Sequence, residues 1–383
     1  MKIVYIANIR IPTEKAHGWQ ICKMCEEFSG QGAQVELWVP GRENDIKTDA
    51  FSFYFLKRNF KIKKIKCFDF YKYYKYLGKF SFYLHNTWFL FKLLWQKVEG
   101  EAIIYTRDLE IAWLFNLRRH KVIFEAHSFS EKNRKLFFFL AKKIKKIIVI
   151  TEKLKRFFLS HDILSENIMI SPDGVDLDIF DLDISKEDAR KKTNLPRNKI
   201  ILGYTGSFKT MGEDKGIAII LDSLKILSKK SKDLLFVAIG GSEVDINYYT
   251  KRAKDKGIDD LVLFLKRVDI KKLAIFQKSF DILLMPFPYS KHYAFYMSPL
   301  KMFEYMASKR PIITSNLPSI KEILNENNCV FFQSDNQKDL AEKIIFLLAN
   351  KNLADKISEQ AYREVKDYTW KKRAEKIINF ISY

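Results

Sequence analysis

The sequence lacks a long apolar run, has only four cysteines, and has far fewer acidic than basic residues. No run reaches the roughly 18–20 consecutive apolar residues that cross a bilayer, and the longest candidate, 83–95, is interrupted by His85, Asn86 and Lys92. The opening residues MKIVYIANIRIP contain no long apolar core or small-residue cleavage site, so they predict a strand and not a signal peptide. We therefore expect a cytoplasmic protein that does not span a membrane.

The few cysteines do not support a redox or zinc site. Cys22 and Cys25 have the spacing of such a pair, but no second pair or histidine cluster completes it. We interpret both as small apolar residues on the inner face of the first helix.

The shortage of acidic residues leaves a formal net charge of +21, from 67 Lys and Arg against 46 Asp and Glu. Such a surplus is typical of proteins that bind nucleic acid, an anionic membrane surface or anionic substrates. A composition rich in lysine and phenylalanine also arises from a biased genome. Charge alone therefore does not decide between these partners.

Length and composition predict two folded domains. Hydrophobic residues make up 47% of the 383 residues and charged residues 30%, and a chain of this length suits two domains of about 150–200 residues. The apolar run Ile3–Ala7, a helical pattern after Gly18 and the run Val35–Val39 form one βαβ unit. We expect further strands at 102–106, 121–125, 147–151, 200–204, 234–239, 261–265, 282–286, 311–314 and 330–332.

A turn at 172–175 and the polar stretch 176–197 separate these strands into two series. The expected fold class is α/β, with two Rossmann-like, doubly wound parallel-sheet domains at 1–178 and 190–366. The lysine-rich amphipathic helix at 369–383 is expected to pack back on the first domain. A single large α/β barrel has the same alternation of strands and helices, but the break favours two sheets.

The segment Met297–Ala307 is the sharpest candidate for a binding site. Ser298 is suited to the N-cap and Pro299 to the first helical position, so the amides of Leu300 and Lys301 predict an anion site suited to a diphosphate. Glu304 lies one turn later on the same face, where its carboxylate can accept hydrogen bonds from a ribose diol. An ordinary capped helix with a solvated Glu304 fits the composition about equally well.

The glycine-bearing loop 203–216 follows a predicted strand and precedes a helix. It has neither the Walker order nor the dinucleotide fingerprint. Close backbone approach at Gly206 and Ser207, together with Lys209 and Lys215, nevertheless suits an anionic leaving group. Glycine loops after strands are common, so this signal is weak alone.

Two more positions follow predicted strands. Gly18 ends the first loop, and His127 stands directly after the strand at 121–125, although a lone histidine there is more often structural than catalytic. The acidic pairs Asp176/Asp178 and Asp181/Asp183 fall in a turn and not at a strand end. We interpret these four as solvated or helix-capping residues and expect no metal.

Taken together, these motifs resemble retaining glycosyltransferase family 4, which has the GT-B fold, over nearly the whole chain. The strongest matches are SPLKMFEYMA followed by PIITSNLPSIKEI, and SPDGVDLDIF, which is similar to the family's PNGVDxxxF turn. GYTGSF…KG is similar to its G-x-x-G…KG loop, and the first-loop glycine with GAQVELWVP is similar to its opening.

The resemblance implies two domains facing each other across a cleft, with the nucleotide-sugar donor held by the C-terminal domain and the acceptor by the N-terminal domain. By matching position, Glu304 would hold the ribose, and the amides of Leu300 and Lys301 the diphosphate or donor sugar. Lys215 would neutralise the diphosphate, which Gly18 lets the backbone approach. His127 matches a histidine that touches the donor sugar near the reacting carbon.

Three departures from the family pattern stand out. The first glutamate of its E-x7-E motif is replaced by Tyr296, while Glu304 keeps the second. The basic residue that normally follows the second glycine is Ser207 here, so Lys209 is a candidate substitute. The loop from Lys209 to Asp214 is slightly long, which affects the assignment of Lys215.

The function implied is a retaining, metal-independent transfer from a UDP-, GDP- or other nucleotide-linked donor to a glycan or lipid-linked oligosaccharide acceptor. The closest resemblance is to bacterial enzymes of surface polysaccharide synthesis, such as capsule, O-antigen or exopolysaccharide. Within the same fold a nucleotide-sugar epimerase or sugar phosphorylase remains an alternative. A nucleic-acid-binding protein has no recognisable motif in its support, so no nucleic-acid partner is expected.

The segment Arg58–Trp95 interleaves lysines with aromatic residues and holds a single acidic residue, Asp69. Aromatic rings suit the headgroup boundary, and lysines are drawn to anionic lipids. The segment therefore predicts a peripheral anchor on the inner face of the cytoplasmic membrane. A solvated basic face over an aromatic core is the alternative.

Overall fold

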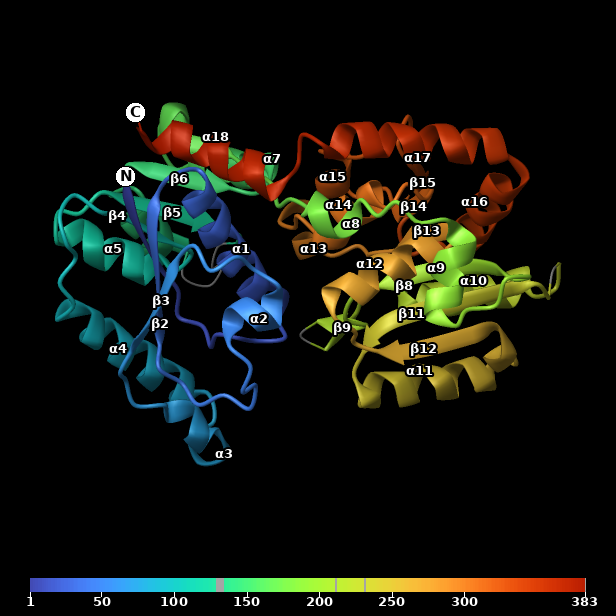
Figure 1. Cartoon of the computed structure of the whole chain (residues 1–383), viewed down its shortest axis with the longest axis horizontal. Coiled ribbons are helices and arrows are strands. Elements are labelled where there is room, and N and C mark those ends of the chain that lie inside the picture. Colours follow the sequence, from blue (N-terminus) through green and yellow to red (C-terminus); the bar gives the residue numbers. More distant parts are fainter. Residues whose placement is uncertain (129–133, 211, 231, 383) are drawn as a thin grey trace. The chain divides into compact units, whose positions relative to one another are not determined.

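The computed structural model describes residues 1–128, 134–210, 212–230 and 232–382. These residues form two compact units, Met1–Pro172 with Trp370–Tyr383, and Asp173–Thr369. Each unit contains one large parallel sheet covered by helices (Figure 1). The expected fold class of two doubly wound parallel sheets is therefore confirmed.

The first unit has a sheet of seven described strands in the order β3-β2-β1-β4-β5-β6-β7, with every neighbouring pair parallel. Its strands are β1 (Lys2–Ile6), β2 (Gln34–Pro40), β3 (Lys61–Ile65), β4 (Ile103–Thr106), β5 (Val122–Ala126), β6 (Lys146–Val149) and β7 (Ile168–Ile170). Its helices are α1 (Ala16–Gly30), α2 (Ala50–Tyr54), η1 (Phe70–Tyr73), α3 (Tyr74–Leu77), α4 (Phe80–Leu94), α5 (Leu109–Leu117), α6 (Arg134–Ala141), α7 (Glu152–Leu159), η2 (Ser165–Asn167) and α18 (Trp370–Ser382).

The second unit has a sheet of six described strands in the order β12-β11-β8-β13-β14-β15, again all parallel. Its strands are β8 (Ile200–Thr205), β11 (Leu234–Gly241), β12 (Val262–Lys266), β13 (Ile282–Met285), β14 (Ile312–Ser315) and β15 (Val330–Phe332), beside the hairpin of β9 (Lys209–Thr210) and β10 (Glu213–Asp214). Its helices are α8 (Leu177–Phe180), α9 (Lys186–Thr193), α10 (Ile217–Leu227), α11 (Glu243–Asp255), η3 (Asp259–Leu261), α12 (Ile270–Ser279), α13 (Lys291–Phe295), α14 (Leu300–Ala307), α15 (Pro318–Lys321), α16 (Gln337–Ala349) and α17 (Lys351–Val365).

Both sheets reverse their strand order at one point, which is where ligands bind in open α/β sheets. The reversal lies between β1 and β4 in the first unit and between β8 and β13 in the second. The strands on either side are almost entirely buried, because helices cover both faces of a parallel sheet. Each unit therefore offers one polar edge at the carboxyl ends of its central strands.

The last helix belongs to the first unit and not to the second. α18 lies against α1, where the rings of Trp19 and Trp370 meet edge to face with centroids 5.6 Å apart. Its residues Trp370, Arg373, Ala374 and Ile377 are buried. Residue 383 of the expected 369–383 helix lies outside the described residues.

The sequence did not predict four of the strands. β3 reads KIKKI, in which three of the five residues are lysines and only Ile65 is buried. It lies at the edge of its sheet, where lysines discourage pairing with another chain. β7 has three residues, and the β9–β10 hairpin has two per strand. Segments this short carry no periodic signal.

Candidate functional site

The first turn of α14 differs from the sequence prediction. Pro299 is the N-cap and the helix begins at Leu300, so Ser298 is not the cap and Pro299 is not the first helical residue. The hydroxyl of Ser298 instead accepts a hydrogen bond from the amide of Asp173 at 2.9 Å. This bond joins the PDGVD turn to the SPLK segment inside the second unit. Leu300 and Lys301 are the first two helical residues, whose amides have no acceptor within the helix.

The loop after β8 is held against the end of β13. Gly216 has φ +98°, and a Cβ there would lie 1.8 Å from the carbonyl oxygen of Pro286, so only glycine fits. The carboxylate of Asp214 accepts hydrogen bonds from the Gly216 amide and the Tyr249 hydroxyl. The loop is thereby fixed at the point where the strand order reverses.

Lys215 and Ser207 meet in this loop, as Lys215 Nζ donates to Ser207 Oγ at 3.1 Å. Burial lowers the pKa of Lys215. Lys209 lies elsewhere, with its ammonium 4.0 Å from the ring centroid of Tyr248. The structure therefore brings Lys215 to the loop glycines and holds Lys209 in a cation–π contact on α11.

Glu304 is anchored from below by a buried glutamine. Gln277 of α12 donates its Nε2 to Glu304 Oε2 and to Thr205 Oγ1, both at 3.1 Å. Burial raises the pKa of Glu304 to about 7, although the Gln277 hydrogen bond and the Lys301 charge act in the opposite direction. Glu304 keeps part of its surface exposed. It is therefore a carboxyl group whose pKa lies near neutral pH, and not a freely solvated one.

Two other positions of the family pattern, Gly18 and Tyr296, have surroundings that the fold alone explains. Gly18 is the third residue of α1 and not part of a loop, and a Cβ there would lie 2.4 Å from both Thr13 Cγ2 and the Tyr54 hydroxyl. Packing inside the first unit alone therefore requires this glycine. Tyr296, in place of the first glutamate of the motif, is the C-cap of α13.

His127 belongs to a network around a fully buried carboxylate that the sequence analysis overlooked. Glu125 Oε1 lies 2.6 Å from His127 Nε2, 2.8 Å from Arg107 Nη2 and 3.0 Å from Arg373 Nη2. Tyr105 donates its hydroxyl to Glu125 Oε2. The two guanidinium groups hold the pKa of Glu125 well below its usual range against the effect of burial. The carboxylate thereby fixes the orientation of the imidazole, as in many functional histidines.

A second polar cluster lies at the strand reversal of the first unit. Arg42 donates Nε to His85 Nε2 at 2.8 Å and Nη2 to Asn8 Oδ1 at 2.6 Å. Asn8 also bonds Asn86 through its side chain and Asp108 through its amide. Burial raises the pKa of Asp108 to about 6. The signal for this cluster was available, since Asn8 and Asp108 directly follow two predicted strands.

The remaining candidates behave as structural residues. Cys22 and Cys25 are buried on α1 with raised thiol pKa values, caused mainly by burial, which confirms their apolar interpretation. Asp176 caps α8, and Asp181 accepts from the Tyr362 hydroxyl. Among the residues with described positions, no group of three or more His, Cys, Asp or Glu could hold a metal ion. Within the same residues, no helix is long and apolar enough to cross a membrane.

Comparison with known proteins gives a consistent set of relatives. The family described as "Glycosyl transferases group 1" matches residues 185–364. The capsular polysaccharide biosynthesis glycosyltransferase CapM of Staphylococcus aureus is 22% identical over 237 residues, 58% of this chain and 57% of its own. The putative teichuronic acid biosynthesis glycosyltransferase TuaH of Bacillus subtilis is 22% identical over 201 residues, 52% of this chain and 46% of its own. This chain thus spans about half the length of these curated relatives.

Solved structures resemble the whole chain. HepE of Anabaena in complex with UDP has a TM-score of 0.73 at 14% identity, with 100% of both chains covered. WaaG, a glycosyltransferase involved in lipopolysaccharide biosynthesis, has a TM-score of 0.70 at 14% identity, covering 99% of this chain and all of its own. At these identities the likeness establishes the shared fold alone.

Proposed function

We propose that this chain is a GT-B glycosyltransferase that transfers a sugar from a nucleotide-linked donor to a glycan or lipid-linked acceptor in bacterial surface polysaccharide synthesis. The observation that carries the proposal is the edge of the second sheet at its strand reversal. There the first turn of α14, the Lys215–Ser207 loop and Glu304 supply donors for a diphosphate and an acceptor for a ribose. The relatives CapM and TuaH, named for capsule and teichuronic acid synthesis, support the product class.

For the donor, we propose a UDP-linked sugar, with a GDP-linked sugar as the second choice. HepE, which has the same fold, has been solved with UDP and with UDP-glucose. In this chain the groups that we assign to the donor lie in the second unit. Glu304 would accept from the ribose hydroxyls, and Lys215 with the amides of Leu300 and Lys301 would face the diphosphate. Gly206 allows the loop backbone to approach the phosphates closely, because its φ of +115° favours glycine.

For the reaction, we propose retention of the anomeric configuration without a metal ion. The bond between the anomeric carbon and the phosphate oxygen breaks, and the acceptor oxygen bonds to that carbon on the same face. The acceptor proton passes to the leaving phosphate, whose charge Lys215 and the helix-end amides stabilise. His127, oriented by Glu125, would contact the donor sugar near the reacting carbon.

A panel of nucleotide sugars tests this function directly. Thermal unfolding is measured with UDP-, GDP- and other nucleotide-linked sugars, because a ligand that binds only the folded state raises the unfolding temperature. The donor that gives the largest shift is then incubated with a lipid-linked acceptor, with and without a chelator, and the anomeric configuration of the product is read by NMR. Absence of any shift across the panel overturns the proposal. A free epimer or a sugar phosphate as the product would indicate the epimerase or phosphorylase alternative.

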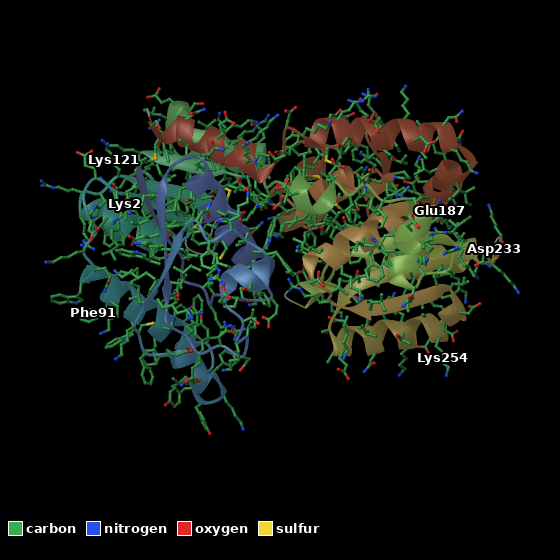
Figure 2. The ribbon with its side chains drawn as sticks, viewed as in Figure 1. Lys2, Phe91, Lys121, Glu187, Asp233 and Lys254 are labelled. Carbon is green, nitrogen blue, oxygen red and sulfur yellow. The ribbon has the colours of Figure 1, made fainter. Side chains whose placement is uncertain are left out.

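We further propose that the first unit docks on an anionic membrane through α4. This helix buries a single stripe of Ser81, His85, Phe89 and Leu93. Most of its remaining surface is apolar or aromatic, with Asn86, Thr87 and Lys92 as the polar exceptions. Phe91 extends away from the ribbon (Figure 2). The exposed large residues on and next to α4 are Phe80, Phe82, Tyr83, Leu84, Trp88, Phe91, Leu94 and Trp95.

Charge complementarity supports lipid as the occupant of this surface. Exposed aromatic rings beside Lys75, Lys79 and Lys92 suit the boundary of an anionic bilayer. The lysines of β3 have a second explanation, because they protect a sheet edge. The docking proposal therefore rests on α4 and not on the lysine-rich residues 61–66. An oriented α4 would present a lipid-linked acceptor to the first unit.

Vesicle sedimentation tests the docking surface. Replacing Trp88, Phe91 and Trp95 by serine should abolish binding to vesicles that contain phosphatidylglycerol, whereas the control pair Tyr289→Ser and Phe346→Ser, two exposed aromatics of the second unit, should not. Equal binding to neutral vesicles, or full binding by the triple variant, would reject α4 as the anchor.

A further inference from the structure

The side chain of Lys301 is a buried cation without a hydrogen-bonding partner. Only 8% of the residue is exposed, and within the described part of the chain its Nζ has no hydrogen bond. The ammonium lies 3.6 Å from the ring centroid of Tyr204, and a Cβ added to Gly206 would be 3.3 Å from it. Burying an ammonium without an anion is costly, and one aromatic ring offsets only part of that cost.

The position of this cation points to its ligand. Tyr204 and Gly206 lie at the end of β8, and Phe287, whose ring centroid is 5.3 Å from Lys301 Nζ, follows β13. The ammonium is therefore at the strand reversal of the second sheet, below the first turn of the helix that carries it. Lys215 is close enough that its charge contributes to lowering the pKa of Lys301. Two cations that interact with each other, one of them in the first turn of a helix, suit an anion of more than one charge.

We propose that the ammonium of Lys301 binds the diphosphate of the donor directly, as its buried charge partner. This inference rests on the proposed function and deepens it, because that function assigned to Lys301 only its amide. A compact ammonium beside Gly206, which has no side chain of its own, suits a phosphate oxygen as a point charge.

Binding of a diphosphate to Lys301 should change the protonation state of its side chain. Burial, and then the charge of Lys215, place the pKa of Lys301 well below its ordinary value, while the charge of Glu304 opposes the shift. Tyr204, which also faces the ammonium, has a pKa raised well above its usual range and stays neutral. A phosphate beside Lys301 favours the charged form and raises the pKa again. At pH values above the pKa of Lys301 in the free protein, donor binding must therefore be accompanied by proton uptake.

Calorimetry with UDP measures both effects on the full chain. The parent protein is titrated at about pH 8, where the phosphate, with its second pKa near 6, and Glu304, with its pKa of about 7, are both largely ionised. Titrations in two buffers of different ionisation enthalpy give the number of protons taken up. We expect Lys301→Met to bind UDP about 10- to 100-fold more weakly. In a series of titrations from pH 8 upward, the parent should take up more protons than Lys301→Met at any pH where Lys301 is deprotonated in the free protein. Uridine, which has no phosphate, should bind both proteins within about threefold by ligand-observed NMR.

Lys321→Met is the matched control, because Lys321 also contacts a ring, that of Phe331 at 4.9 Å, away from the sheet reversal. It should leave UDP affinity and proton uptake unchanged. Parent-like UDP affinity in Lys301→Met overturns the proposal, as does equal weakening for UDP and uridine, which would assign Lys301 to packing on Tyr204. If Lys301→Met fails to fold, Lys301→Gln takes its place in the same titrations, with the same two deciding outcomes. If the parent binds neither UDP nor any nucleotide sugar, the proposed function itself fails.

Discussion

The two units each bury one charge near the carboxyl edge of their sheet, and they treat it in opposite ways. In the first unit, Glu125 is fully buried and is surrounded by Arg107, Arg373 and His127. In the second, the ammonium of Lys301 is almost as buried and has no hydrogen-bonding partner among the described residues. A charge with all its partners inside the chain is part of the fold, whereas a buried charge without one is available to a ligand. The comparison therefore separates structural from binding charges without reference to sequence motifs.

The largest expected effect tests the paired charge. Arg373→Met removes one guanidinium from Glu125 and should lower the free energy of unfolding of the first unit by about 3 kcal/mol or more. Urea unfolding followed by circular dichroism measures this loss. As a control, Lys266→Met breaks the exposed pair with Glu243 and should cause no measurable change. If Arg373→Met were as stable as the parent, Glu125 would not depend on its partners.

The second-largest expected effect is on donor affinity, when the side chain of Glu304 is removed. Glu304→Ala loses the bonds of a charged acceptor to the ribose, so the free energy of binding UDP should become less favourable by about 1.5–3 kcal/mol while the fold is kept. Calorimetry measures the affinity, and thermal unfolding checks the fold. Gln277→Ala, which removes only the group that holds Glu304 in place, should have a smaller effect in the same direction. Parent-like affinity in Glu304→Ala would remove the ribose assignment.

His127 is the one member of the Glu125 network proposed to meet the substrate. His127→Ala should reduce kcat by about tenfold or more while the Kd for the donor changes much less, because contacts near the reacting carbon act mainly in the transition state. Steady-state kinetics with the donor identified by the panel separates the two parameters. Turnover within twofold of the parent would leave His127 as a structural partner of Glu125, like Arg373.

The pH dependence of donor binding sharpens the comparison from the side of the second unit. With a pKa of about 7 in the free protein, Glu304 is mostly protonated at pH 6 and mostly ionised at pH 8. Because deprotonation of Lys301 would act in the opposite direction, the effect is measured as a ratio. The affinity of the parent for UDP-glucose, whose phosphates do not titrate in this range, divided by that of Glu304→Gln should rise several-fold from pH 6 to 8. The raised pKa also means that Glu304 stabilises the fold at low pH and loses that contribution as the pH passes through about 7. A ratio that stays constant between pH 6 and 8 would contradict the role of the ionised carboxylate.

The smallest effect concerns stability without ligand. Lys301→Met exchanges an unpaired buried amine for an apolar chain of similar length, so the free energy of unfolding should stay within about 1 kcal/mol of the parent or rise. Urea unfolding without nucleotide measures it beside Arg373→Met. A loss as large as that of Arg373→Met would show that Lys301 is as much a part of the fold as Glu125.

The sequence predicted the two sheets and the family because both depend on local patterns. Runs such as Ile3–Ala7 and Ile282–Pro286 are apolar throughout, as strands buried on both faces must be, and they match β1 and β13 within two residues. The GT-B resemblance is confirmed by the family match and the whole-chain structural neighbours. β3 was not predicted because its three lysines resemble those of a solvated segment.

The sites were predicted less completely, because their contacts join distant residues. Ser298 has the composition of an N-cap, but its hydroxyl is used by the amide of Asp173, which is 125 positions away. The partners of Glu125 come from β4 and α18 as well as from the adjacent His127, and no periodicity links them. Lys301 was proposed for its amide, since only the fold places its ammonium beside Gly206. The roles of His127, Lys215 and Glu304 stay predictions until the experiments above are done.

The contact between Glu125 and Arg373 spans 248 positions of the chain, which sets the order of events during synthesis. The ribosome makes β5 and its carboxylate long before α18 emerges, and the whole second unit is translated in between. At about 5–20 residues per second, the delay is roughly 12–50 seconds. During that interval the carboxylate of Glu125 lacks one of its two arginines, and the face of α1 that packs against Trp370 is uncovered. A chaperone that recognises exposed apolar surface would have that time to bind α1 before α18 covers it.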